Sequence, residues 1–133
     1  MVIFLQGWQM NIERFIDIAL VASLKSTHRV KIGAVLLRHG KPISIGWNKV
    51  GKTHPRSKWF IHAELDCLLG LHQQVDYSGT TMVIARQNRQ GCVLYCQPCE
   101  QCKVTLKEYG VQKVIYTVGL PFKGHNLYQL TAI

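Results

Sequence analysis

Acidic residues are scarce in this chain, and their scarcity is the first constraint on what the protein binds. The 133 residues include 7 Asp and Glu against 16 Lys and Arg, which gives a formal net charge of +9 at pH 7. This charge favours polyanions or phosphorylated small molecules as partners. It does not distinguish a nucleotide from a nucleic acid, and it carries no information about the fold.

The sequence also lacks an apolar run long enough to span a membrane. Glu13, Arg14 and Asp17 interrupt the first long apolar segment. Residues 1–5 are apolar, but they have neither the basic leader nor the small-residue cleavage site of a signal peptide. We therefore expect a cytoplasmic protein that does not associate with membranes.

Internal repeats, linkers and low-complexity stretches are absent as well. With 47% apolar and 17% charged residues, the composition is that of an ordinary globular protein, so disorder is not expected. A chain of this length suits one domain with its own hydrophobic core. These observations predict a single domain over residues 1–133.

Cysteine is present, but its pattern does not indicate a disulfide framework, because the five cysteines are an odd number. Cys99 and Cys102 form a Cys-x-x-Cys pair directly after Pro98. A zinc ribbon needs a second ligand pair, which the sequence lacks. A thioredoxin-like redox pair normally follows the first strand of its fold, whereas this pair comes late.

His62 and Glu64 give the cysteine pair a catalytic interpretation. Zinc binds imidazole nitrogen and thiolate sulfur, and a catalytic site keeps one position open for water. His62, Cys99 and Cys102 would supply three protein ligands. Glu64 lies two residues from His62, where a carboxylate could serve as general acid and base. His-x-Glu followed by Pro-Cys-x-x-Cys is the signature of zinc-dependent nucleobase deaminases, so Glu64 is the predicted catalytic residue.

The other three cysteines have simpler interpretations. Free cysteine is among the most buried residue types, so Cys67 and Cys92 are expected in the hydrophobic core. Cys96 precedes Cys99 by three residues and is expected in the pocket wall, with a contact to zinc as the alternative.

Hydrophobic periodicity predicts the order helix, hairpin, helix, strand, helix, strand. Because the two helices that carry the ligands can lie side by side, their positive N-terminal ends would meet at one spot and favour thiolates. This order predicts an α/β fold, a three-layer α/β/α sandwich around a mixed sheet of about five strands. The expected segments are a helix over about 12–25 with Asn11 as its N-cap, strands at 32–37 and 43–47 joined at His39-Gly40, a loop over 48–60, a helix from near His62 to 69, a strand at 81–85, an extended piece at 92–95, a helix between Pro98 and Gly110, and a strand at 114–117.

Nearly everything from Ile12 to Thr117 resembles the cytidine deaminase superfamily. Residues 29–35 resemble the first-strand motif of deoxycytidylate deaminases, in which an Arg precedes Val-Gly-Ala-Val. Gly46-Trp47-Asn48 resembles their Gly-Tyr-Asn at the end of the second strand. Residues 102–116 resemble the helix of the family that runs into the next strand. The resemblance implies that Asn48 holds the sugar or base, that His62, Cys99 and Cys102 bind zinc, and that Glu64 shuttles protons.

Two segments depart from that family pattern. Deoxycytidylate deaminases commonly carry Asn-Ala where this chain has Asp66-Cys67. They also continue, after the strand equivalent to 114–117, into a helix and a fifth parallel strand, whereas this sequence ends sixteen residues after Thr117. A strand at 127–133 is therefore expected to return antiparallel. That arrangement resembles the branch with free-nucleoside deaminases and several deaminase toxins.

Basic and aromatic residues near the predicted pocket mouth are candidates for substrate binding. Arg29, His54 and Arg56 could contact a phosphate, for which guanidinium groups are well suited. The alternative is a solvated basic surface, which most charge runs form. Ala63, between the two residues of the His-x-Glu motif, is a further substrate-binding candidate. Trp47 and Trp59 could stack on a base or belong to the core.

The leading functional hypothesis is zinc-dependent hydrolytic deamination of a cytosine nucleotide, a cytidylate or deoxycytidylate, to the uridylate and ammonia. The alternative is a deaminase that acts on cytosine or adenine in single-stranded DNA or RNA, because the zinc motif does not choose between the two bases. A zinc-stabilised binding module is disfavoured by the intact Glu64. The expected partners are a small-molecule nucleotide and further copies of the chain in a homo-oligomer.

Overall fold

The computed structural model describes residues 2–50, 60–69, 78–98, 100–119 and 128–132, and every structural statement below concerns these ranges. Its helices and strands follow the predicted order along the chain. They are α1 (Val2–Ser23), β1 (Lys31–Arg38), β2 (Lys41–Trp47), β3 (Lys49–Val50), β4 (Phe60–Ile61), α2 (Ala63–Leu69), β5 (Thr80–Gln87), β6 (Val93–Leu94), α3 (Glu100–Tyr109), β7 (Val111–Thr117) and β8 (Tyr128–Ala132).

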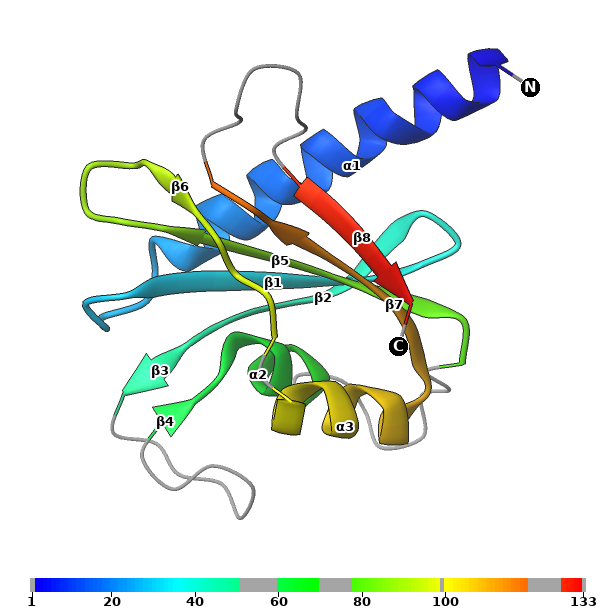
Figure 1. The fold of residues 1–133 in the computed structure, drawn as a ribbon. Coiled ribbons are helices and arrows are strands. Elements are labelled where there is room, and N and C mark those ends of the chain that lie inside the picture. The colour runs from blue at the N-terminus through cyan, green and yellow to red at the C-terminus, as the bar shows by residue number, and fades with distance from the viewer. Residues whose placement is uncertain (1, 51–59, 70–77, 99, 120–127, 133) are drawn as a thin grey trace.

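A mixed sheet separates two layers of helices (Figure 1). Its strand order is β2-β1-β5-β7-β8, and the short β6 pairs with the end of β5. β5 and β7 run parallel, whereas the other neighbouring pairs of this sheet are antiparallel. Helix α1 covers one face, and α2 and α3 lie on the other. The predicted three-layer α/β/α sandwich is thereby confirmed.

The turn between β1 and β2 has the predicted two-residue length. His39 and Gly40 both have positive φ angles, 50° and 73°, and they connect the paired residues Arg38 and Lys41. Two residues with positive φ match the twist of the flanking strands, and glycine adopts this conformation without steric cost.

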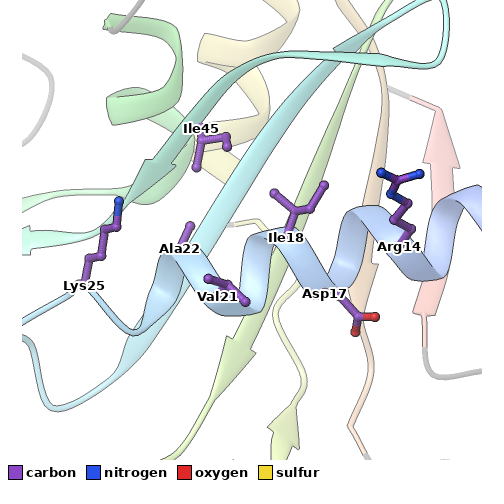
Figure 2. A pocket seen from close by; sticks show the side chains of 7 residues that line it. All are labelled: Arg14, Asp17, Ile18, Val21, Ala22, Lys25 and Ile45. Atoms are coloured by element: carbon purple, nitrogen blue, oxygen red, sulfur yellow. The ribbon is translucent and has the colours of Figure 1, made fainter.

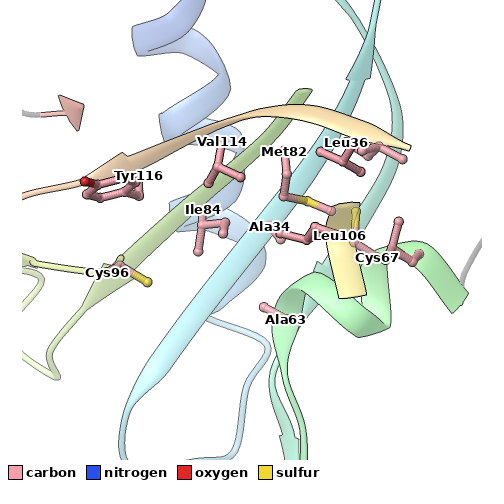
Figure 3. Close-up of a cluster of buried hydrophobic side chains, with 12 residues drawn as sticks. Ala34, Leu36, Ala63, Cys67, Met82, Ile84, Cys96, Leu106, Val114 and Tyr116 are labelled. Carbon is pink, nitrogen blue, oxygen red and sulfur yellow. The ribbon is translucent and has the colours of Figure 1, made fainter. Parts of the chain in front are cut away.

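Alternating side chains of the strands build one core on each face of the sheet. In β1, Ala34 and Leu36 face α2 and α3, whereas Val35 and Leu37 face α1. The cluster on the α2 and α3 face, drawn in Figure 3, packs the start of α2 against the sheet, with Ala63 among its members. Its buried members are Ala34, Leu36, Ala63, Cys67, Leu68, Met82, Ile84, Cys96, Leu106, Val111, Val114 and Tyr116.

Two glycines allow the helices to approach the sheet closely. A Cβ atom at Gly33 would lie 1.8 Å from the carbonyl oxygen of Ala19 in α1. A Cβ atom at Gly46 would lie 2.5 Å from the backbone nitrogen of Cys67 in α2. Because both neighbouring atoms belong to the backbone, any larger residue at either position must push a helix away from the sheet.

The structure corrects the predicted N-terminal boundary of the first helix. Helix α1 begins at Val2, so Asn11 lies inside it and does not act as its N-cap. No proline occurs among the first 41 residues, and a single interior Asn costs a helix little. Within the described ranges, no helix combines the length and hydropathy needed to cross a membrane.

Three further segments refine the predicted fold. The segment expected as a loop over 48–60 carries short strands at its ends, since β3 pairs antiparallel with β4. Cys92 is exposed in a turn, so its predicted core position is wrong. Strand β8 returns antiparallel to β7, as expected for the end of the chain.

Candidate metal centre and active site

His62 and Glu64 lie at the start of α2. The backbone N–H of Asp66 donates to the carbonyl oxygen of His62 at 2.9 Å, which is the first hydrogen bond of the helix and makes His62 its N-cap. Glu64 therefore occupies the first turn, where the positive end of the helix dipole favours a carboxylate. Its side chain is buried, with 6% of the residue exposed.

Cys102, in the first turn of α3, meets these two residues. Its Sγ lies 3.6 Å from Nδ1 of His62. Donor atoms of His62, Glu64 and Cys102 all lie within 4.8 Å of one another. Two helices far apart in the sequence thus place an imidazole, a thiol and a carboxylate at one point, as their motifs predict.

The spacing of these donors fits zinc. A tetrahedral zinc ion ~2.3 Å from sulfur and ~2.05 Å from nitrogen holds those two atoms about 3.6 Å apart. The observed Sγ–Nδ1 distance of 3.6 Å matches this value. Cys99, the third predicted ligand, lies outside the described residues, directly before α3.

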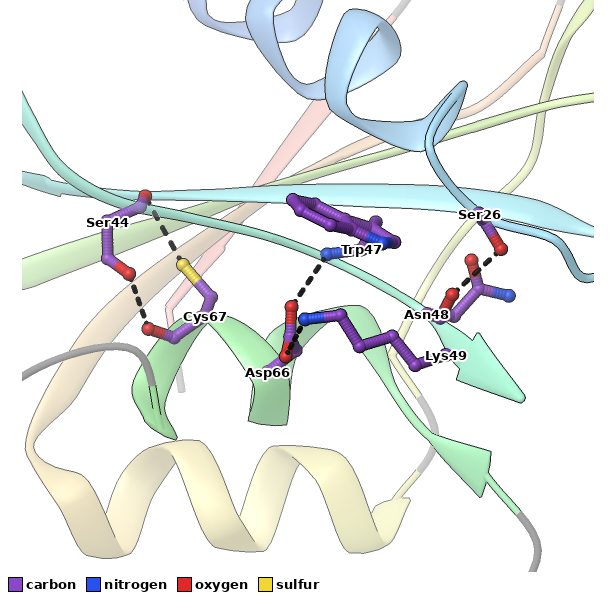
Figure 4. Close-up of polar contacts among 7 residues, drawn as sticks. All are labelled: Ser26, Ser44, Trp47, Asn48, Lys49, Asp66 and Cys67. Carbon is purple, nitrogen blue, oxygen red and sulfur yellow. Dashed lines mark hydrogen bonds and ion pairs between the residues drawn. The ribbon is translucent and has the colours of Figure 1, made fainter. Parts of the chain in front are cut away.

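A set of polar contacts fastens α2 to the neighbouring edge strand (Figure 4). The carboxylate of Asp66 accepts hydrogen bonds from the backbone N–H of Trp47 at 3.1 Å and from Nζ of Lys49 at 2.7 Å. Ser44 Oγ donates to the carbonyl oxygen of Cys67 at 2.6 Å, and Cys67 Sγ donates back to the carbonyl oxygen of Ser44 at 3.3 Å. The two residues that depart from the family pattern, Asp66 and Cys67, therefore fix the helix that carries His62 and Glu64.

Asn48 is buried, and its side chain is hydrogen-bonded to the start of β1 and to the residue before it. Its Oδ1 accepts from the backbone N–H of Ile32 at 3.0 Å, and its Nδ2 donates to the carbonyl oxygen of Val30 at 2.7 Å. Each end of the amide keeps one further hydrogen-bonding position. Asn48 thus has a structural role, and its predicted contact with the substrate stays a prediction.

The remaining substrate-binding candidates have different surroundings. Arg29 is exposed in the bend that leads into β1, and Ala63 is fully buried in the cluster of Figure 3. His54, Arg56 and Trp59 lie outside the described residues.

Trp47 contacts two cations and is only partly buried. The ammonium nitrogens of Lys25 and Lys49 lie 4.9 Å and 4.4 Å from the centre of its ring. These cation–π contacts involve the ring for which stacking on a base and a core position were the two alternatives.

Two cysteines beside the site are protonated thiols. Burial raises the pKa of the Cys67 thiol to about 12. Burial, followed by the charge of Glu64, raises the pKa of the Cys96 thiol well above its ordinary range. Both belong to the buried cluster of Figure 3, which confirms the core position of Cys67. In the described part of the chain, the group of metal donors consists of His62, Glu64 and Cys102, without Cys96.

A groove of about 310 Å³ between α1 and β2 lies apart from this chemistry (Figure 2). Ile18, Val21, Ala22 and Ile45 give it an apolar lining. It opens along α1, whereas the metal donors come from α2 and α3 on the opposite face of the sheet. None of its seven lining residues is a His or Cys, so we do not assign catalysis to it.

Sequence reasoning missed Arg86. It lies on β5 two residues after Ile84, on the face that α2 and α3 cover, and Nε of its guanidinium is buried without a hydrogen-bond partner among the described residues. The available signal was an arginine inside an otherwise apolar, alternating strand.

These observations define a class, an α/β/α protein with a zinc-type donor set at the N-termini of two adjacent helices. The family model for the cytidine and deoxycytidylate deaminase zinc-binding region matches residues 9–118, and the chain belongs to this family. The cofactor of the site is zinc.

Known relatives agree with this membership. The deoxycytidylate deaminase of Schizosaccharomyces pombe is 29% identical over 133 residues, which cover 89% of this chain and 40% of that protein. The chain therefore spans less than half the length of this curated relative.

Two solved structures resemble the fold. The dCMP deaminase of cyanophage S-TIM5 in its apo form has a TM-score of 0.63 and 22% identity, covering 80% of this chain and 82% of that one. The cytidine deaminase of Burkholderia pseudomallei has a TM-score of 0.61 and 16% identity, covering 90% and 91%.

Proposed function

We propose that the protein is a zinc-dependent deaminase that hydrolyses a cytosine nucleotide, a cytidylate or deoxycytidylate, to the uridylate and ammonia. The observation that carries this proposal is the meeting of His62, Glu64 and Cys102 at the N-termini of α2 and α3. The relative from Schizosaccharomyces pombe is a deoxycytidylate deaminase, and the cyanophage S-TIM5 enzyme has been solved in complex with dCMP and dUMP. Both support a pyrimidine nucleotide as the substrate.

The chemistry requires a proton carrier beside the metal. Zinc, when bound, lowers the pKa of a water molecule so that it can attack C4 of the ring near neutral pH. Glu64 would take one proton from the attacking water and give it to ring nitrogen N3. It would then move the second proton of that water, from the hydroxyl group at C4, to the departing amino group, which leaves as ammonia. The first-turn position on α2 suits this role, because it directs a buried carboxylate to the imidazole and thiol donors.

The remaining assignments are part of the same proposal. His62, Cys99 and Cys102 hold the zinc, Asn48 and Ala63 line the base and sugar pocket, and the substrate phosphate lies near three basic residues, Arg29, His54 and Arg56. The chain forms one domain over residues 1–133, works in the cytoplasm and assembles into a homo-oligomer.

The decisive experiment combines one isosteric change with a substrate panel. Glu64→Gln keeps the shape of the side chain but cannot carry the proton, so the variant should fold and bind zinc normally. Its rate of ammonia release from cytidylates should fall by at least ~10²-fold. Glu13→Gln is the matched control, because Glu13 is exposed on α1 at the other face of the sheet.

The panel consists of cytidine, cytidylates, their triphosphates, adenosine compounds and single-stranded oligomers. Near-normal turnover by Glu64→Gln would place the chemistry elsewhere. Faster deamination of oligomers than of mononucleotides, with a steep loss at higher salt, would instead identify a nucleic-acid deaminase, because release of counterions from several phosphates produces that slope.

A further inference from the structure

Arg86 lies on the face of the sheet that α2 and α3 cover. In β5, Met82 and Ile84 belong to the cluster beneath α2 and α3, and side chains alternate along a strand, so Arg86 faces the same side. It lies ~6.6 Å beyond Ile84, toward the carboxyl end of β5, where the sheet meets the start of α2. The parallel pair β5 and β7 ends at this edge, which is the usual position of ligands in α/β sheets.

Backbone and side-chain contacts hold the position of Arg86 firmly. It pairs across the sheet with Ile32 on one side and Leu94 on the other. Its backbone N–H donates to Oγ1 of Thr117 at 3.3 Å, and that hydroxyl donates to the carbonyl oxygen of Leu94 at 2.6 Å. The backbone N–H of Cys96 donates to the carbonyl oxygen of Thr117 at 2.9 Å. Arg86 and the segment leading into the Cys-x-x-Cys motif are thereby fixed together.

The guanidinium of Arg86 has a hydrogen-bond donor that no described residue uses. Its Nε atom is buried and has no hydrogen-bond partner within the described ranges. In the same ranges no carboxylate forms an ion pair with it. Buried donors and charges without partners are costly, so this Nε atom calls for a partner such as a ligand, an ion or a water molecule.

Glu64 and Arg86 both lie near one buried thiol, that of Cys96. The charge of Glu64 raises the pKa of Cys96, and the charge of Arg86 lowers it, so both charges are near this sulfur. Cys96 and Ala63, the neighbour of Glu64 in sequence, also belong to one buried cluster. A proton acceptor and a donor of hydrogen bonds thus lie near the same buried thiol.

A cytosine ring matches this pair of groups. Its amino group at C4 and ring nitrogen N3 need a proton carrier, and its carbonyl oxygen at C2 is an acceptor adjacent to N3. As water adds to C4, electron density moves onto N3 and, by conjugation, onto that oxygen, where a guanidinium would stabilise it. Adenine has a C–H group at the equivalent position and would leave the Arg86 donor unpaired.

We infer that Arg86 donates hydrogen bonds to the C2 carbonyl oxygen of the substrate ring and thereby selects cytosine over adenine. This inference rests on the proposed function and adds the residue that reads the base. Arg86→Met, which removes every donor at similar length, should lower kcat/KM by roughly ten- to a hundredfold for cytosine substrates. The loss should be equal for cytidine and cytidylate, and Arg86→Lys should restore part of it.

The test pairs these variants with a substrate whose acceptor is weakened. In 2-thiocytidine 5′-monophosphate sulfur replaces the C2 oxygen, so the penalty of Arg86→Met should shrink on this substrate relative to the ordinary cytidylate. The cytosine-to-adenine ratio should also narrow in Arg86→Met. Arg89→Met is the matched control, since Arg89 is exposed in the turn after β5 and should behave as wild type. Zinc content and Tm, measured for all variants, show that the folded holoenzyme is being compared.

Each outcome distinguishes between explanations. If Arg86→Met lowered kcat/KM for monophosphates but not for cytidine, Arg86 would bind the phosphate, and the inference would be overturned. The same follows if the penalty on the 2-thio substrate equals that on the ordinary one. A wild-type protein that deaminates no cytosine compound would instead overturn the proposed function itself, before any variant is compared.

Discussion

At the scale of single residues, Cys102 and Cys92 allow a direct comparison of a proposed zinc ligand with a cysteine outside the proposed site. Cys102 lies 3.6 Å from Nδ1 of His62, whereas Cys92 is exposed in a turn. Cys102→Ala should lose most of the bound zinc and lower Tm, because metal binding stabilises the folded state. Cys92→Ala should keep about one zinc per chain. Elemental analysis after dialysis against a weak chelator measures both, and full zinc content in Cys102→Ala would remove the site.

The candidate site residues were predictable because each of the two motifs is local. His62 and Glu64 are two positions apart at the start of α2, and Cys102 lies in the first turn of α3, so each motif sets its residues at a helix N-terminus. The exposure of Cys92 and the place of Arg86 were not predictable in this way. Both depend on which strands pair in the sheet. Cys92 lies in the connection between β5 and β6, and Arg86 pairs with Leu94 of β6.

At the scale of elements, the approach of α2 to the sheet depends on Gly46. A Cβ atom there would lie 2.5 Å from the backbone of Cys67 and 2.8 Å from the carbonyl oxygen of Ala63. Gly46→Ala should therefore displace α2, lowering the free energy of unfolding by ~1–3 kcal/mol and weakening zinc binding as well. Chelator competition and urea unfolding measure the two effects.

Gly40→Ala is the control for this displacement. Gly40 also has a constrained backbone, with φ of 73°, but a Cβ atom there would meet nothing within 4 Å. This variant should lose stability, because a residue with a side chain rarely adopts that φ, while its zinc affinity stays that of the wild type. Equal zinc affinity in Gly46→Ala and Gly40→Ala would show that the position of α2 does not control the site.

Most elements were predictable from periodicity and turn residues, and the exceptions have physical causes. The His39-Gly40 turn, α2, α3 and the antiparallel β8 agree with the sequence. The start of α1 does not, because a polar residue such as Asn11 acts as an N-cap only where a helix begins, and α1 already begins at Val2. The paired strands β3 and β4 were missed because two-residue strands are too short to show an alternation of apolar and polar residues.

At the scale of the whole molecule, the sheet separates the candidate site on one face from the purely apolar core on the other. The metal donors, Arg86 and the protonated thiols Cys67 and Cys96 lie on the face of α2 and α3, whereas α1 and the apolar groove lie across the sheet (Figure 1). The face of α2 and α3 therefore carries buried ionisable groups that the core on the α1 face lacks among its described members. Global stability should depend on pH through that face.

Cys67 makes this dependence measurable. A thiol in the unfolded chain ionises near pH ~8.5, whereas burial raises the pKa of Cys67 to about 12 in the folded protein. Below pH ~8.5 the thiol is protonated in both states and contributes no slope. Between these two values the unfolded chain binds fewer protons than the folded one. The free energy of unfolding should therefore fall as pH rises, by up to about 1.4 kcal/mol per pH unit for this group.

Urea unfolding of the zinc-loaded protein from pH 7 to pH 10.5 tests this expectation. Cys67→Ala should be the less stable protein at pH 7, since it leaves a small cavity and loses the contact with Ser44. The difference in the free energy of unfolding between wild type and Cys67→Ala should shrink as pH rises above ~8.5, because the variant has no thiol at this position to keep protonated. Cys92→Ala should follow the wild-type curve throughout, because its side chain is exposed. If the curves of Cys67→Ala and wild type stay parallel over this range, the buried thiol does not control the alkaline limit of stability.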